Sequence, residues 1–269
     1  MVNLTPVHPA TPAAAYIGGK RILAKTIIAR INATPHEAYC EPFVGMGGIF
    51  LRRSLAPKME AINDINGEVA NLFRILQRHY PQFMDTLRFQ VTSRREFERL
   101  SRTDPSTLTD LERAARFLYL QRLAFGGKVR GQNFGVTMDG GRFNLMKLAP
   151  QLEEIHERIS GVVIENLGWR AFIERYDRPT TLFYLDPPYW GCEDDYGKAV
   201  FSREDFAEMA EVLGRIRGRF ILSLNAVPGV FETFSKFEIE EVDCSYSIQG
   251  QGRAKEVKEV LISNFRLPD

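Results

Sequence analysis

The sequence has few cysteines and no long apolar run. Three cysteines among 269 residues are too few and too scattered for a disulfide framework, which favours a reducing compartment. No apolar stretch approaches the roughly 18 residues that a membrane helix needs. Residues 1–15 lack the basic start and apolar core of a signal peptide. We therefore expect a cytoplasmic protein that does not contact a membrane.

Several common ligand motifs are also missing. The four histidines and three cysteines show no zinc-like spacing, so no metal site is predicted. The glycine-rich stretch at 45–48 lacks the third glycine of Gly-x-Gly-x-x-Gly, which disfavours a nicotinamide oxidoreductase, and no Lys-Ser/Thr follows as in a phosphate loop.

Charge is unevenly distributed, although the net charge is only +1. Residues 88–147 hold 12 basic and 6 acidic residues, a net of +6, whereas the remainder holds 23 basic and 28 acidic residues, a net of −5. A basic middle in an acidic frame is typical of a DNA-facing insertion. A solvated helical face with extra arginine has the same charge, so both interpretations stay open.

Apolar runs separated by glycine turns and helical spacing predict an α/β fold with a mostly parallel sheet. The expected strands are 38–43, 60–63, 162–164, 181–185 and 220–224, followed by an antiparallel edge pair at 237–242 and 257–263. A helix is expected to start near Gly47. The alternation stops at 81–123, which is helical and basic in pattern, and at 126–143, a loop or hairpin. We predict a Rossmann-like domain over 1–80 and 150–269, with a mainly helical insertion at 81–149.

Asp186-Pro187-Pro188-Tyr189 directly follows the apolar strand at 181–185, where α/β sheets bind ligands. Two prolines fix the backbone and leave carbonyls free to accept hydrogen bonds. The Asp186 carboxylate and the Pro187 carbonyl can each accept one N–H of an exocyclic amine, and Tyr189 can stack on a base that has left the helix. The alternative, a strand end with a surface aromatic, accounts for fewer of the four residues.

Three further segments favour a nucleoside-like ligand. Gly45 and Gly47 follow the first strand and allow close approach to the backbone. Asp64 ends the next strand, where a carboxylate accepts hydrogen bonds from ribose hydroxyls or caps the following helix. Tyr16 and Lys20 flank a glycine pair at a helix start, where Lys20 can hold a carboxylate such as that of a methionine moiety.

These motifs, in this order, resemble the Dam-type (alpha group) adenine-specific DNA methyltransferases from Tyr16 to about Asn264. The resemblance implies S-adenosylmethionine as methyl donor and a flipped adenine that stacks on Tyr189, next to Asp186. It implies a donor pocket lined by Tyr16, Lys20, Phe43, Gly45, Gly47, Asp64 and Asp186. The segment from Arg253 to Leu261 looks like the family's late Arg-Lys-x-x-x-Glu-Leu-Leu strand, with imperfect spacing.

Residues 120–130 are similar to the entry into the family's DNA-reading hairpin. The Gly-Glu-Phe-Asn-x-Pro-x-Gly pattern of members that read GATC is not intact around 134–144, so that specificity is not carried over. By residue type, candidate phosphate or guanine contacts are Arg122, Lys128, Arg130 and Arg142, and candidate adenine readers are Gln132 and Asn133. Solvated surface charge competes with this interpretation for each of them.

The sequence thus predicts a site-specific adenine-N6 methyltransferase acting on double-stranded DNA. No cysteine follows the two prolines as a nucleophile, so we expect direct transfer without a covalent enzyme intermediate. The alternatives are methylation of cytosine N4, RNA adenine or a protein glutamine, and an inactive DNA-binding relative. We expect a monomer or weak dimer without metal in a bacterial or phage-infected cell. The recognised site and any partner nuclease, as in restriction-modification, are not predicted.

Overall fold

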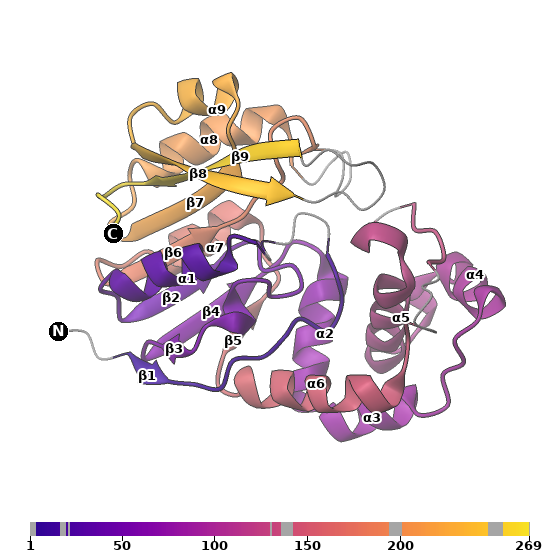
Figure 1. Ribbon diagram of the computed structural model, residues 1–269. Helices are drawn as coiled ribbons and strands as arrows, with labels where there is room; N and C mark the ends of the chain where they lie inside the picture. The colour runs from indigo at the N-terminus through magenta and orange to yellow at the C-terminus, as the bar shows by residue number, and fades with distance from the viewer. Residues whose placement is uncertain are drawn as a thin grey trace.

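The computed structural model describes residues 4–16, 20, 22–129, 131–135, 142–193, 201–246 and 255–268. Within them, seven strands form one sheet in the order β5-β4-β2-β6-β7-β9-β8 (Figure 1). They are β2 (Ala38–Glu41), β4 (Met59–Asn63), β5 (Val163–Glu165), β6 (Thr181–Leu185), β7 (Arg219–Asn225), β8 (Glu238–Tyr246) and β9 (Lys255–Ser263). A separate antiparallel pair joins β1 (Thr5–Pro6) to β3 (Leu55–Ala56).

Strand directions confirm the predicted topology. The pairs among β5, β4, β2, β6 and β7 are all parallel, and β9 is antiparallel to both β7 and β8. Because β2 lies between β4 and β6, the loops that follow these three strands open at the same edge of the sheet.

Helices cover both faces of the sheet, as the buried strands require. Leu182 and Tyr184 of β6 belong to the apolar cluster that contains α1 (Ala24–Ala33) and α2 (Gly67–Arg78). Phe183 and Leu185 alternate with them and join the cluster of the opposite face. That face carries α7 (Trp169–Tyr176), α8 (Arg203–Leu213) and α9 (Pro228–Thr233). The two covered faces confirm the Rossmann-like fold class.

Helices α3 (Tyr80–Leu87), α4 (Arg94–Arg102), α5 (Asp110–Leu123) and α6 (Leu145–Arg158) lie beside the sheet (Figure 1). Thr109 and Glu112 form a capping box that starts α5. Ala124 pairs with Phe134 in an antiparallel bridge after this helix. The helical prediction for 81–123 is confirmed, but the expected boundary at 149/150 falls inside α6, which runs from the insertion back to the sheet.

The helix expected from Gly47 is wrong. A turn is followed instead by the short 3-10 helix η1 (Phe50–Arg52). Gly45 and Gly47 have φ angles of 50° and 77°, outside the right-handed helical region. No α-helix can therefore begin at this point.

Candidate active site

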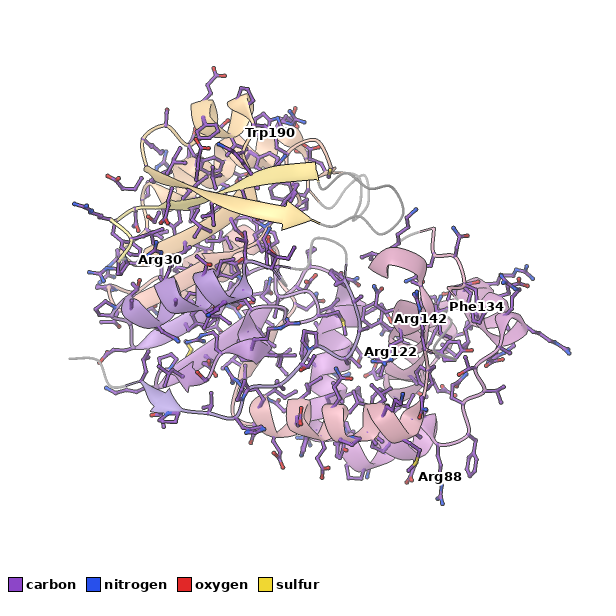
Figure 2. All side chains as sticks on the ribbon, viewed as in Figure 1. Arg30, Arg88, Arg122, Phe134, Arg142 and Trp190 are labelled. Atoms are coloured by element: carbon purple, nitrogen blue, oxygen red, sulfur yellow. The ribbon has the colours of Figure 1, made fainter. Side chains whose placement is uncertain are left out.

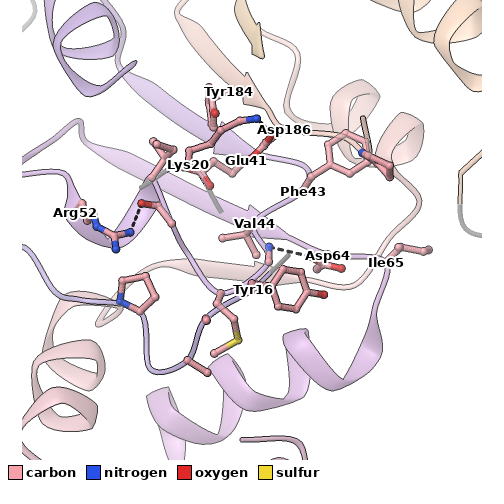
Figure 3. A pocket seen from close by; sticks show the side chains of 18 of the residues that line it. Tyr16, Lys20, Glu41, Phe43, Val44, Arg52, Asp64, Ile65, Tyr184 and Asp186 are labelled. Carbon is pink, nitrogen blue, oxygen red and sulfur yellow. Dashed lines mark hydrogen bonds and ion pairs between the residues drawn. The ribbon is translucent and has the colours of Figure 1, made fainter. Parts of the chain in front are cut away.

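A pocket opens at the edge of the sheet where β2, β4 and β6 end (Figure 3). Its lining comprises Pro12, Ala14, Ala15, Tyr16, Lys20, Glu41, Phe43, Val44, Gly45, Met46, Gly48, Ile49, Arg52, Asp64, Ile65, Tyr184, Asp186, Pro188 and Phe201. All predicted donor-contacting residues except Gly47 are in this set. Segments from five regions of the sequence therefore meet around one cavity.

Asp64 fixes the turn after β2. Its carboxylate accepts hydrogen bonds from Gly45 N (2.9 Å) and Asn66 N (2.8 Å). The cap of α2 is Asn66, whose side chain accepts from Glu68 N at 3.0 Å, so Asp64 does not serve as the helix cap. Burial raises the pKa of Asp64 to about 6, and the two backbone donors oppose that rise.

Gly47 lies on the protein side of the same turn. A Cβ added there would lie 2.7 Å from Leu51 Cγ, so the position needs glycine for packing rather than for ligand approach. Gly45 faces the Tyr16 ring, and a Cβ there would lie 3.0 Å from Tyr16 Cδ1. Gly48, which was not singled out from the sequence, lines the pocket.

Lys20 is the centre of a buried ionic cluster. Its ammonium lies 3.0 Å from Asp186 Oδ1 and 3.1 Å from Glu259 Oε2, and it donates to the Tyr189 hydroxyl. It also lies 4.0 Å from the centroid of the Tyr189 ring. Lys20 is 1% exposed and Glu259 is fully buried, and a buried lysine needs such partners. The ammonium thus contacts protein carboxylates, whereas the sequence suggested the carboxylate of the donor.

Asp186 is partly exposed and has its two side-chain contacts on one oxygen. Lys20 and the Ser223 hydroxyl, at 3.3 Å, both contact Oδ1. Desolvation raises the pKa of Asp186 to about 6 against the attraction of Lys20, and nearby Glu259 adds to the rise. The Oδ2 atom is then the oxygen that can accept a hydrogen bond from a ligand in the pocket.

The backbone after Asp186 is held to the end of β7. Pro187 and Pro188 are buried, which excludes water from one side of the carboxylate. Asn225 accepts from Trp190 N and donates to Trp190 O, both at 3.0 Å. This reciprocal pair fixes the segment that carries the half-buried Tyr189.

Sequence reasoning missed three polar groups of the site. Glu41 accepts from Tyr39 OH at 2.6 Å, and burial raises its pKa to about 8, so it is protonated at neutral pH. Ser223 bonds Tyr184 OH at 2.9 Å. Glu259 contacts Lys20. The sequence presents it as the glutamate of the late motif at 253–261, but no role in the site was predicted for it.

The predicted DNA contacts fall into two groups. Arg122 and Arg142 lie close together in the insertion (Figure 2) and serve internal hydrogen bonds. Arg122 donates to Ala13 O and to Arg142 O (3.2 Å), and Arg142 donates to Ala124 O at 3.2 Å. Both side chains are half-buried, and their donors bind backbone carbonyls of this region and of Ala13.

The other candidates lie on the segment after α5. Lys128 and Asn133 are exposed. Gln132 is half-buried and donates to Gln121 Oε1 (3.1 Å) and to Lys128 O (2.9 Å). Arg130 lies outside the described residues.

In the part of the chain that the structure describes, no three His, Cys, Asp or Glu side chains gather as metal ligands. Over the same residues, every helix is too short or too polar to cross a bilayer.

The comparisons with known proteins agree with this geometry. A type II methyltransferase of Lactococcus lactis subsp. cremoris, M1.LlaDCHI, is 26% identical over 94% of this chain and 95% of its own length. A DNA adenine methylase of Salmonella typhi is 26% identical over 91% of this chain and 92% of its own length. A type II methyltransferase of a Chlorella virus, M.CviBI, is 21% identical over 78% of this chain and 81% of its own length.

Residues 16–248 match the family described as D12 class N6 adenine-specific DNA methyltransferase. The match spans the glycine turn, the insertion and the Asp-Pro-Pro-Tyr corner. The chain belongs to the D12 class of N6 adenine-specific DNA methyltransferases.

Proposed function

We propose that this chain methylates N6 of adenine in double-stranded DNA, with Asp186 and Pro187 as the acceptors of the target amine. The observation that carries the proposal is the Asp186 carboxylate, held through Oδ1 by Lys20 and Ser223 at the rim of the pocket. A carboxylate fixed through one oxygen presents the other to an incoming N–H group. The family membership supplies the reaction class.

The pocket fits S-adenosylmethionine by its donor and acceptor groups. Asp64 offers a carboxylate for ribose hydroxyls, and Gly45 and Gly48 let a ligand approach the backbone. Phe43 and Tyr16 supply aromatic walls for a purine. When bound, S-adenosylmethionine supplies an electrophilic methyl group.

The residues at the corner orient the amine. Asp186 Oδ2 and the Pro187 carbonyl each accept one N–H, which directs the nitrogen lone pair into the pocket. The ionised Asp186 carboxylate also receives the proton that the nitrogen loses. Alignment of this kind contributes roughly 7–11 kcal/mol to catalysis.

Tyr189 is the proposed stacking surface for the flipped base. Lys20 donates to its hydroxyl and lies over the ring. These contacts fix the position of the ring before DNA binds. Stacking on one aromatic contributes about 1–3 kcal/mol, against an unstacking cost of a few kcal/mol.

Residues 81–149 form the proposed DNA-recognition module. Within it, Lys128 and Asn133 are the exposed candidates, with Gln132 beside them. We assign Arg122 and Arg142 to structural support of the same region because their donors face backbone carbonyls.

The test uses S-adenosylmethionine labelled in its methyl group with duplex DNA of mixed sequence, followed by digestion to nucleosides. Label in N6-methyldeoxyadenosine is expected. Label in N4-methyldeoxycytidine alone, or in RNA alone, would replace the proposal, and absence of label from all of these would overturn it.

The residue assignment is tested by Asp186→Ala, expected to lower the rate more than about 100-fold. Its melting temperature should also fall, because the buried Lys20 loses one of its two carboxylates, while circular dichroism at low temperature should show that the fold is kept. The matched control is Asp85→Ala, an exposed aspartate on α3, which should methylate normally. Expression in a host without adenine methylation, with modified bases mapped by single-molecule sequencing, then gives the recognised site.

A further inference from the structure

One wall of the donor pocket is an irregular segment held by side chains of α5 and α6. Residues 11–16, here called the N-terminal arm, form no helix or strand, and Pro12, Ala14, Ala15 and Tyr16 line the pocket. Backbone carbonyls in such a segment need donors from elsewhere. The donors come from α5 and α6, which lie beside the sheet.

Three side chains supply these hydrogen bonds. Gln151 on α6 donates to Thr11 O (3.2 Å) and Pro12 O (2.7 Å). Arg122 on α5 donates to Ala13 O. Gln121, the preceding residue, donates to Ala15 O at 2.8 Å. The position of the pocket wall therefore depends on the insertion.

Gln121 differs from the other two because it also holds residues 127–129 and 131–133, here called the reading segment, which carry the candidate DNA contacts. The side chain is 1% exposed. Its Nε2 donates to Gly127 O as well as to Ala15 O, at 2.8 Å each, and its Oε1 accepts from Gln132 at 3.1 Å. Both N–H donors of the amide are thus used, one toward the pocket wall and one toward the reading segment.

Direct packing supports the same connection. Gly127 has a φ of 68°, and a Cβ there would lie 3.1 Å from Ala15 C and Tyr16 N. A groove that contains Tyr16 and Asp64 of the donor pocket is also lined by Val129 and Gln132. The reading segment and the pocket wall therefore touch through backbone as well as through Gln121.

We propose that Gln121 is a positioning residue that couples methyl-donor binding to engagement of DNA by residues 127–129 and 131–133. The inference rests on the proposed function, because it takes that segment as a DNA contact. DNA contacts that restrain Gln132 also restrain the Gln121 amide to which it donates, and Gln121 in turn holds Ala15 and the adjoining Tyr16. By linkage, each ligand then tightens the binding of the other by the same factor.

The experiment measures binding without methyl transfer. The dissociation constant of S-adenosylhomocysteine is determined by calorimetry, with and without a saturating duplex that carries the mapped recognition site. The ratio of the two constants is the coupling factor. We expect a factor of at least about 5 for the native chain and a factor within about twofold of one for Gln121→Leu.

The matched control is Gln151→Leu, which removes two arm hydrogen bonds but, among the described residues, none to 127–129, 131 or 132. It should weaken S-adenosylhomocysteine binding in the absence of DNA and keep the native coupling factor. Gln132→Met breaks the connection from the other end without touching the arm, and it should also lower the factor. If Gln121→Leu does not fold, Gln132→Met decides.

A native coupling factor of one or less overturns the inference, as does an unchanged factor in Gln121→Leu or, where that variant is unfolded, in Gln132→Met. Failure of the proposed function is distinguishable, because no methylated adenine would then be found in the mapping step. If the native chain methylates adenine but Gln121→Leu keeps the native coupling factor, the proposed function stands and only the coupling role of Gln121 is excluded.

Discussion

At the Asp186 carboxyl, desolvation outweighs the attraction of Lys20 and raises the pKa to about 6. The carboxyl must be ionised to accept an N–H, so the active fraction falls as the pH drops through that value and is nearly full above it. We expect log(kcat/KM) for DNA to fall by up to about one per pH unit below the midpoint, because this constant reports the enzyme before DNA binds. Initial rates across the range from about pH 5 to 8 check this.

Two variants separate this titration from others. Ser223→Ala removes a hydrogen bond that lowers the pKa of Asp186, so the midpoint should rise. Asp64→Asn acts on donor binding, so it should change the donor KM and leave this midpoint in place at saturating donor. A midpoint that stays fixed in Ser223→Ala would contradict the assignment to Asp186.

Residue chemistry was predictable where neighbouring residues act together. Asp186 and Asp64 each end a strand, and their place at the sheet edge follows from that. The ion pair between Lys20 and Glu259 was not predictable, because it joins the segment before α1 to strand β9, which are far apart in the sequence. Pairing across the sheet, which local sequence does not encode, created that contact.

Among the elements, the turn after β2 makes a strict demand on residue type. Gly47 combines a φ of 77° with a Cβ position 2.7 Å from Leu51. Gly47→Ala should therefore add left-handed strain of about 1–2 kcal/mol to an overpacking cost of about 1–3 kcal/mol. Urea unfolding monitored by circular dichroism measures the loss.

Gly161→Ala is the matched control for this change. Gly161 has a φ of 79° and no atom within 4 Å of its Cβ position, so it should show the strain alone. Equal losses for the two variants would show that the Leu51 contact costs nothing.

Element positions followed from apolar runs where those runs were uninterrupted, as in β6 and β7. Helix α6 was not predicted from its apolar residues in the same way. It contains Pro150 and carries Met146 with 86% of its surface exposed, so its apolar stripe is broken. Its Asn144 cap and its packing on α2 stabilise it instead.

At the scale of the whole molecule, the basic excess of residues 88–147 left two interpretations open, a DNA-facing insertion and a solvated helical face. Several of its arginines instead donate within the protein, among them Arg113, Arg122 and Arg142. Lys128 is exposed, and its neighbour Val129 lines the groove that also holds Tyr16. Lys128→Ala should weaken DNA binding across sequences and reduce the slope of log Kd against log salt by about one. Titrations of duplex DNA at several salt concentrations measure that slope.

Lys58→Ala is the control with the same charge change. Lys58 is exposed, lies just before β4 at the edge of the sheet away from the pocket, and pairs with Glu37 at 3.2 Å. It should leave the slope unchanged. An equal change of the slope in both variants would show that Lys128 affects DNA binding only through the net charge of the protein.

Strand β9 lies between β7 and β8 although it follows both in the chain, and it brings Glu259 to Lys20. During translation, β7 therefore has an unpaired edge until residues 255–263 have left the ribosome. Until then Lys20 also lacks one of its carboxylates. We expect nascent chains to remain inactive and dependent on chaperones, so that methylation begins only after this late strand is inserted.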